Sequence, residues 1–482
     1  MGRCEALTDA SMTPRLLCQD RGNLLARPPP RTRMNSTSPP PAPPAAPSFG
    51  EALCFWLKLG CISFGGPAGQ IALMHRELVT ERRWLSERRF LHALNYCMVL
   101  PGPEAQQLAT YLGWLLHRTW GGIAAGVLFV LPSLGLLVLL SWLYLRFGDT
   151  ALLAGVFAGI KPAVVAIVLQ AAHRLGSRTL RTPCLWATAL GAFAGLALLN
   201  LPFPLILALA AASAWLGSRV APAQWPLGQV HAASGAPHPP ALIDDHTPPP
   251  PHARFAWSRL GRVLGVGALL WAVPMGALLA WVGGSHAYTQ MAWFFTKAAW
   301  LTFGGAYAVL PYVVQGAVEQ HGWLSAAQMI DGLALGETTP GPLIMVVAFV
   351  AYLGGYQLAL LGPEHLALAG AMAAVLVTWF TFLPSFVLIL AGGPLVEQTQ
   401  RQLGWTAPLT AITAAVVGVI LHLALFFGQH VLWPQGLGSA PDLAAAAITA
   451  LAAWALMRHK LGVVPVIAGC AVLGLALQWL TG

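Results

Sequence analysis

The sequence has very little charge for its length. Of its 482 residues only 9% are charged, whereas 57% are hydrophobic, and ordinary soluble domains contain roughly 25% charged residues. So little polar surface cannot solvate this much apolar mass in water. Repeated apolar runs of about 17–25 residues instead match the thickness of the hydrocarbon core of a bilayer. The composition excludes a water-soluble enzyme of two or three domains and predicts an all-α polytopic membrane protein.

The motifs of several other protein classes are also missing. The chain contains no G-x-x-x-x-G-K-[ST] loop and only four lysines, which argues against a built-in ATP motor. None of its seven cysteines is spaced as C-x-x-C, so we expect reduced packing residues rather than a zinc site or disulfides. The absence of H-E-x-x-H argues against a membrane-embedded enzyme, which is the rival class. We therefore predict no enzymatic activity, no cofactor and no bound metal.

The formal charge of +9 lies in short arginine clusters between apolar runs. Cytoplasmic loops of membrane proteins carry such an excess of positive charge, so we expect no nucleic-acid partner. Residues 1–50 are rich in arginine and proline without an apolar segment of signal-peptide length, which predicts a disordered cytoplasmic tail. Residues 217–259 predict a cytoplasmic linker. A metal-binding tract is the less favoured alternative there, because the histidines are irregularly spaced among prolines.

The rest of the chain contains an internal repeat. A shift of 239 residues, with no gap, superimposes four matching elements: Lys58 on Lys297, Phe64-Gly65-Gly66 on Phe303-Gly304-Gly305, Trp84-Leu85-Ser86 on Trp323-Leu324-Ser325, and Pro101-Gly102-Pro103 on Pro340-Gly341-Pro342. After an insertion, Leu131-Pro132-Ser133 is matched by Leu383-Pro384-Ser385. The sequence thus predicts two related domains, residues 51–216 and 291–482, and a connecting helix over 260–283.

Each repeat contains six apolar pieces that we expect to be embedded in the membrane. In chain order they are 52–74, 90–116, 120–144, 151–172, 184–199 and 201–216, then 291–311, 327–355, 366–391, 405–427, 441–457 and 461–481. With the connecting helix this makes thirteen embedded segments. We predict about nine full spans plus four broken or re-entrant segments, namely those with Phe-Gly-Gly or Pro-Gly-Pro. If all thirteen crossed the membrane, the five-arginine loop 75–89 would lie outside, against the usual bias.

A single connecting helix turns the second repeat upside down, which gives two inverted-topology repeats. The arginines agree with this arrangement, because loop 75–89 contains five of them and its counterpart 314–328 contains none. We therefore expect a multi-pass protein of the bacterial inner membrane with a cytoplasmic N-terminus and a periplasmic C-terminus.

The Gly-Gly and Pro-Gly-Pro motifs break helices within apolar runs. Unpaired backbone at membrane depth is tolerated only where it faces protein or a watery cavity, and paired breaks in inverted halves indicate a transporter's substrate site. Helix N-termini there would offer N–H groups to an anion. The predicted substrate-binding glycines are Gly65, Gly66, Gly102, Gly304, Gly305 and Gly341. The alternative is that the breaks are kinks that help packing.

Polar side chains near the breaks complete the predicted site. Lys58 and Lys297 would balance the charge of an anion, although snorkelling to the interface is an equally weighted alternative. Gln106, Thr338 and Thr339 add neutral donors beside the breaks.

Two carboxylates flank the Pro-Gly-Pro motifs, Glu104 after the first and Glu337 before the second. Either is a candidate for proton coupling, because desolvation favours the protonated form of a carboxyl group. The alternative is a carboxylate at an exposed helix end or one paired with a nearby lysine.

Both halves carry long motifs of one kind. They are Lys58-Leu59-Gly60 through Phe64-Gly65-Gly66-Pro67, Arg83-Trp84-Leu85, Leu100 through Gly113, Thr302 through Tyr307, and Glu337 through Pro342. These motifs closely resemble the chromate ion transporter (CHR) family in its two-domain, long-chain form, over about residues 51–482. The resemblance implies a bacterial inner-membrane transporter that exports chromate and confers chromate resistance, driven by the proton-motive force or by sulfate exchange.

The predicted function is therefore secondary active export of chromate, a tetrahedral dianion for which sulfate is the obvious competitor. A sulfate or other oxyanion carrier and a channel stay open as alternatives. The expected partners are chromate or sulfate and the lipid bilayer, and a homodimer is compatible with the sequence.

Overall fold

The computed structural model describes residues 44–148, 150–220, 225, 240–248, 250–303, 305–398 and 406–481. Within these residues the chain forms sixteen α-helices and no β-strand, apart from an isolated bridge between Leu85 and Ile243. Seven of the described helices are long and apolar enough to cross a membrane. This confirms the prediction of an all-α polytopic membrane protein. The predicted tail lies outside the described residues, except for residues 44–50.

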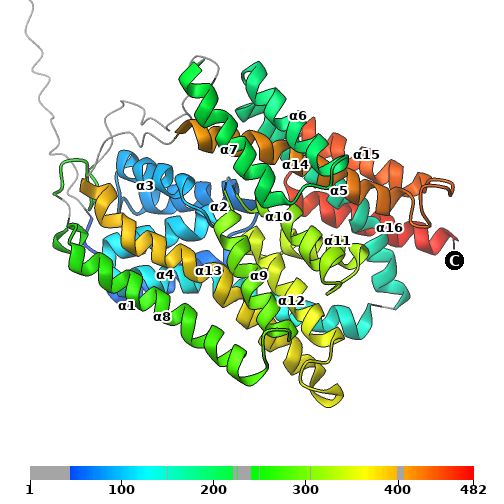
Figure 1. Cartoon of the computed structure of the whole chain (residues 1–482), viewed down its shortest axis with the longest axis horizontal. Coiled ribbons are helices and arrows are strands. Elements are labelled where there is room, and N and C mark those ends of the chain that lie inside the picture. The colour runs from blue at the N-terminus through cyan, green and yellow to red at the C-terminus, as the bar shows by residue number, and fades with distance from the viewer. Residues whose placement is uncertain are drawn as a thin grey trace, which may run out of the picture. The chain divides into compact units, whose positions relative to one another are not determined.

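Figure 1 shows the order of the helices. The first half contains α1 (Phe49–Ile62), α2 (Gly66–His75), α3 (Glu87–Val99), α4 (Glu104–Phe147), α5 (Ala151–Thr179), α6 (Pro183–Ala197) and α7 (Phe203–Val220). After α8 (Trp257–Trp281), the second half contains α9 (Ala287–Leu301), α10 (Ala306–Val314), α11 (Ala326–Thr338), α12 (Val346–Gln357), α13 (Leu366–Gln398), α14 (Thr406–Leu432), α15 (Leu443–Met457) and α16 (Val463–Thr481). These helices follow the thirteen predicted segments closely, and the four segments expected to be broken are interrupted.

Helix α4 is two helices joined at a sharp bend. His117 and Arg118 have non-helical torsions there, and φ of Arg118 is 56°. Glycines let the two arms touch, because a Cβ added to Gly113 would lie only 2.5 Å from the carbonyl oxygen of Gly121. The arm before the bend corresponds to α12 and the arm after it to α13. This agrees with the prediction of separate segments at 90–116 and 120–144.

The repeat is visible in local backbone structure. A π-helical turn follows α2 at Arg76–Glu81, and another follows α10 at Gln315–Gln320. Serine side chains then cap the next helices, Ser86 for α3 and Ser325 for α11. Because π-helical turns are rare, two of them at equivalent positions are a specific sign that both halves share one fold.

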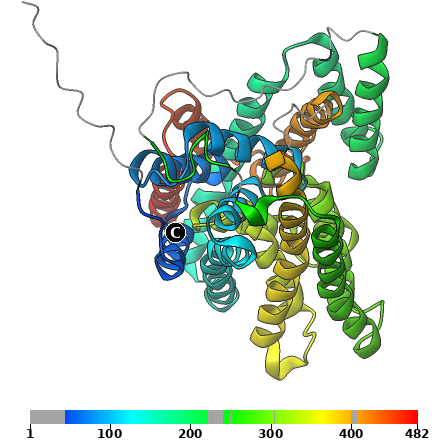
Figure 2. The ribbon, with the colours of Figure 1, turned by 90° about the vertical axis from the view of Figure 1, so that its left-hand side faces the viewer.

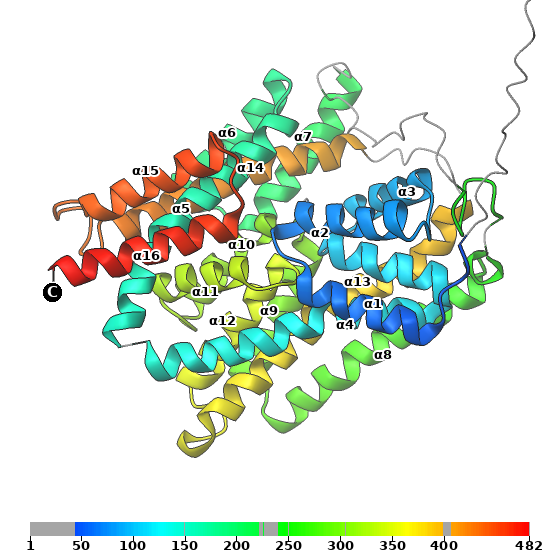
Figure 3. The same cartoon turned by 180° about the vertical axis from the view of Figure 1, so that it is seen from behind.

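The helices form two groups. We call α1–α4 and α9–α13 the core helices, and α5–α7 and α14–α16 the scaffold helices; α8 runs along α13 (Figure 2). In the scaffold, α5 packs against α15 and α16, and its counterpart α14 packs against α6 and α7 (Figure 3). The long scaffold helix of each half therefore packs against the short terminal pair of the other half.

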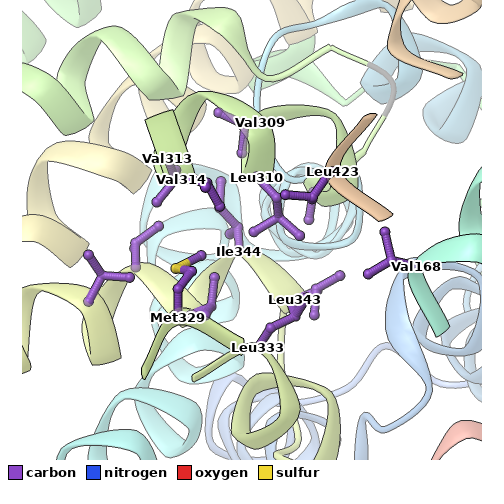
Figure 4. Close-up of a cluster of buried hydrophobic side chains, with 14 of the residues drawn as sticks. Val168, Val309, Leu310, Val313, Val314, Met329, Leu333, Leu343, Ile344 and Leu423 are labelled. Carbon is purple, nitrogen blue, oxygen red and sulfur yellow. The ribbon is translucent and has the colours of Figure 1, made fainter. Parts of the chain in front are cut away.

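Aliphatic side chains join the second half's core helices to the scaffold (Figure 4). Val309, Leu310, Val313 and Val314 come from α10, Met329 and Leu333 from α11, Leu343 and Ile344 from the turn after the second Pro-Gly-Pro, Val168 from α5 and Leu423 from α14. Within a bilayer such side chains stabilise the contact through close van der Waals packing rather than through removal from water. This cluster fixes the second broken pair of helices against the scaffold.

The end of the predicted linker is attached to the first half. The amides of Leu242 and Ile243 donate to the carbonyl oxygens of Arg83 (2.9 Å) and Trp84 (3.0 Å). Further on, the His252 ring donates to the Trp114 carbonyl oxygen at 2.9 Å, and burial lowers the pKa of this histidine. The described part of the linker thus lies across the loop that precedes α3.

The contact between α5 and α16 leaves no room for a side chain at Gly159. A Cβ there would lie 1.9 Å from the Cys470 carbonyl oxygen, so Gly159→Ala forces the helix backbones apart. We expect a loss of about 1–3 kcal/mol in stability, measured as a lower Tm of the detergent-solubilised protein. Gly135→Ala is the control, because nothing lies within 4 Å of its added Cβ. An unchanged Tm for Gly159→Ala would contradict the close packing.

Candidate functional site

A glycine with positive φ lies in each of the four helix breaks. The values of φ are 88° for Gly65, 129° for Gly102, 100° for Gly305 and 105° for Gly341. Residues with a Cβ rarely adopt this region, which explains why glycine recurs. Gly66 also has a positive φ, 68°. The remaining predicted glycine, Gly304, lies outside the described residues.

Two backbone hydrogen bonds bring the breaks of the two halves together. The Gly102 amide donates to the Thr302 carbonyl oxygen at 2.7 Å, and the Gly341 amide donates to the Ser63 carbonyl oxygen at 2.9 Å. Both acceptors are buried and directly precede a Phe-Gly-Gly motif. Each Pro-Gly-Pro turn therefore binds the Phe-Gly-Gly break of the other half. Such reciprocal contacts are typical of parts related by an approximate two-fold axis.

The Leu-Pro-Ser motifs lie against the same turns. A Cβ on Gly102 would lie 2.3 Å from Ser385 Oγ, and one on Gly341 would lie 2.6 Å from the Ser133 Cβ. Both serines are buried. In the sequence these motifs indicated only the duplication, and their serines were not predicted as site residues. Their pairing across the repeat was the available signal.

Gln70 is a second residue of the site that the sequence analysis missed. Its buried Nε2 donates to the carbonyl oxygens of Gly341 and Ser63, the latter at 3.3 Å. It thereby satisfies carbonyls that the breaks leave unpaired within their own helices. The counterpart of Gln70 is Val309, which has no polar side-chain atom. A side-chain amide therefore supports the contact between Gly341 and Ser63, whereas the contact between Gly102 and Thr302 has no equivalent glutamine. A buried glutamine one turn after a break was the signal.

The helices that precede the breaks have side-chain N-caps, whereas those that follow the breaks have none. The side chains of Ser48, His286, Ser86 and Ser325 cap α1, α9, α3 and α11. By contrast, no side chain caps α2, α4, α10 or the short turn Leu343–Met345, which follow the breaks. Four helix starts without a side-chain cap thus lie at the paired breaks. Uncapped N-termini favour a bound anion through their N–H donors and the helix dipole.

Comparisons with known proteins show the family of this chain. Residues 50–216 and 289–475 match the chromate transporter family. The chain belongs to this family. It is 33% identical to the chromate transport protein of Pseudomonas aeruginosa over 90% of this chain and 93% of that protein. It is 28% identical to the chromate transport protein of Cupriavidus metallidurans, over 92% and 98% of the two chains. No solved structure matches it.

The family resemblance predicted from the motifs is thereby confirmed. A probable chromate transport protein of Synechococcus elongatus is also 28% identical, over 85% of this chain and 91% of that protein. Family membership assigns no role to individual residues, so the predicted site residues are described next from their contacts in this structure.

The two predicted lysines of this chromate transporter are exposed rather than buried beside the glycines. Lys58 lies on α1 and Lys297 on α9. Lys297 lines a cavity of about 780 Å³, together with Tyr312 on α10 and Pro384 of the second Leu-Pro-Ser motif. This places Lys297 beside a site element, whereas Lys58 shares only its exposure and position in the repeat.

The neutral donors are engaged within their own helices. Gln106 Nε2 donates to Thr110 Oγ1 at 3.0 Å. The hydroxyl of Thr338 donates to the carbonyl oxygen of Ala334 (3.1 Å), and that of Thr339 donates to Gly336 (3.1 Å). These residues therefore support the helix ends at the breaks in this conformation.

The two predicted carboxylates have different surroundings. Glu337 is buried and accepts a hydrogen bond from the Tyr307 hydroxyl, which lies in the first turn of α10. Glu104 is half-buried and is the first residue of α4, where the helix N-terminus favours a negative charge. Both lie next to a break, and only Glu337 is tied to one by a side-chain hydrogen bond in the described structure.

Two further buried carboxylates were not predicted. Glu397 on α13 pairs with Arg89 of α3 at 2.6 Å and accepts a hydrogen bond from Tyr111. Asp331 on α11 lies 3.5 Å from Lys161 of α5 and accepts a hydrogen bond from Tyr144. Their partners come from distant parts of the chain, so sequence spacing gave no signal.

Gly341→Ala tests the contact between the halves. The change adds backbone strain of about 1–3 kcal/mol and a clash with Ser133, so we expect most chromate uptake by everted vesicles to be lost. Uptake is compared at equal amounts of membrane-inserted protein. Gly191→Ala, whose added Cβ meets nothing within 4 Å, is expected to retain uptake. Normal uptake by Gly341→Ala would show that transport does not require the positive φ of residue 341 or its close approach to Ser133.

Proposed function

We propose that this transporter exports chromate across the bacterial inner membrane and thereby confers chromate resistance. The observation that carries the proposal is the meeting of four uncapped helix starts at glycine breaks contributed by both halves. Family membership supports it, since curated relatives at 28–33% identity are named chromate transport proteins.

The substrate is a tetrahedral dianion held mainly by backbone donors. The amides of Gly102 and Gly341 are already bonded to Thr302 and Ser63, so we assign the substrate donors to the first turns of the helices that follow the breaks, which the glycines let a substrate approach closely. Oriented helix dipoles favour negative charge at the same place. Sulfate has the same shape and charge, so it is the expected competitor or exchange partner. Lys58 and Lys297 supply positive charge on the flanks of α1 and α9.

The membrane topology follows from the connecting helix and the arginines. Helix α8 is apolar and long enough to span the bilayer, and a single span between two equivalent domains inverts the second. The arginine-rich loop 75–89 then lies in the cytoplasm with the N-terminus, and the C-terminus lies in the periplasm.

Substituting both lysines tests their part in the function. We expect Lys58→Gln with Lys297→Gln to raise the KM for chromate uptake into everted vesicles, because the local positive charge is lost. Lys460→Gln, an exposed lysine near the C-terminal end of α15, is the control for a lower net charge. A double variant with an unchanged KM would remove the lysines from the substrate path.

Proton coupling is tested separately from substrate binding. Burial makes Glu337 the stronger candidate for carrying a proton, so Glu337→Gln is expected to make uptake independent of an imposed pH gradient. Glu104→Gln is compared directly with it, and Glu364→Gln changes an exposed carboxylate as control. If wild-type uptake ignores a protonophore but follows a sulfate gradient of opposite direction, anion exchange is the driver.

A further inference from the structure

Equivalent core helices of the two halves have different contacts with the scaffold. Helix α10 packs against α14, and α11 packs against α5, α14 and α16. Their counterparts α2 and α3 have no comparable packing against any scaffold helix in the described part of the chain. The two pairs share one backbone fold, so this difference reflects their positions rather than their local structure.

The exposure of the side chains follows the same difference. In α10 eight of nine residues are buried, whereas in α2 only Gln70 and Met74 of ten residues are buried. At the breaks, Phe64 is 43% exposed and Met98 is 40% exposed, while Glu337, the counterpart of Met98, is 4% exposed. The paired breaks are thus uncovered on the side of α2 and α3 and covered on the side of α10 and α11.

An ion pair between a buried carboxylate and a partly exposed lysine crosses the covered boundary. Asp331 belongs to the core helix α11 and is 2% exposed, and Lys161 belongs to the scaffold helix α5. Tyr144 donates to Asp331 Oδ2 at 2.9 Å, and Oδ1 of the same carboxylate has no hydrogen-bond partner among the described residues. An ion pair at this depth is favourable only while its partners remain together.

Among the described residues, the uncovered side has no ion pair between a core helix and a scaffold helix. The counterpart of Asp331 is His92, whose ring donates to the Val396 carbonyl oxygen at 3.3 Å. That contact joins α3 to α13, so both partners are core helices. The ion pair between Arg89 and Glu397 likewise stays within the core. The charged contact of Asp331 with Lys161 therefore favours one placement of α11 against the scaffold.

We propose that Asp331 and Lys161 form the latch of a gate made by α10 and α11, with Tyr144 of the core helix α4 orienting the Asp331 carboxylate, and that α2 and α3 are the equivalent gate in its open position. This inference rests on the proposed function and topology, under which the site is open to the cytoplasm and closed to the periplasm. In the transport cycle the two gates exchange conformations. Helices α10 and α11 leave the scaffold, and α2 and α3 move onto it.

Thiol labelling tests the latch without any substrate. Ala308→Cys is the reporter on the closed gate, because Ala308 is fully buried, and Ala72→Cys is the reporter on the exposed face of α2. Each is labelled with a membrane-impermeant maleimide in detergent, and labelling of the same chain without the reporter is subtracted. We expect the Ala72→Cys reporter to react and the Ala308→Cys reporter to be protected.

Breaking the latch is expected to expose the closed gate. With Asp331→Asn, labelling of the Ala308→Cys reporter should rise about tenfold as the open state gains population, and Tyr144→Phe should give a smaller rise. Glu397→Gln removes a buried carboxylate pair that stays within the core, so the reporter should remain protected. The exchange of Lys161→Asp and Asp331→Lys should restore protection if the charge pair is what holds the gate.

Two results would overturn the latch. One is a reporter that stays protected in Asp331→Asn, and the other is equal exposure in Glu397→Gln, which would indicate general loosening. A monodisperse peak on size exclusion identifies the variants that remain folded. Labelling needs neither chromate nor a proton gradient, so failure of the proposed substrate would leave this result unchanged, and failure of the latch would leave the substrate assays unchanged.

Discussion

Two backbone hydrogen bonds, exchanged between the halves, hold the interrupted helices of this transporter together. Gly102 and Gly341 donate, and the residues before the opposite Phe-Gly-Gly breaks accept. The close approach requires glycine at both turns and places Ser133 and Ser385 against them. The same contacts bring uncapped helix starts of both halves to one place. The oxyanion site, the proton coupling and the gate that we propose are all built on this junction.

Much of the fold could be predicted because its signals are local. Long apolar runs define the helices, and glycine or proline within them defines the breaks. A gapless match at an offset of 239 residues, from Lys58 to Pro103, also predicted that the breaks occur in equivalent pairs. The bend of α4 at His117 was visible only as a boundary between two predicted segments, since no proline marks it.

The candidate site was less predictable, because its side-chain partners lie far apart in the sequence. Gln70 binds the turn at Gly341 in the other half, and Lys161 meets Asp331 across the boundary between core and scaffold. No spacing rule connects such residues. The lysines at 58 and 297 stood out because they repeat, yet both are exposed. The repeated glycines lie at the paired breaks, whereas the repeated lysines lie exposed on helices beside them. The internal repeat was therefore a better guide to the glycines than to the charged residues.

The two halves keep a common backbone while their side chains differ where motion is expected. Gln70, Met98 and His92 in the first half correspond to Val309, Glu337 and Asp331 in the second. Glu337 and Asp331 are buried carboxylates, whereas Met98 is exposed, so the two gates that we propose are held with unequal strength. Under the proposed gating, such an inequality sets which conformation of the empty transporter is more populated, whereas the driving gradient sets the direction of net transport.

The position of the bound anion is the most direct measure of the central junction. A cryo-EM map of the protein with chromate is expected to show density within hydrogen-bonding distance of the helix starts that follow Gly65, Pro103, Gly305 and Pro342. Density bound only at the exposed lysines, or away from both Pro-Gly-Pro turns, would contradict the junction as the substrate site.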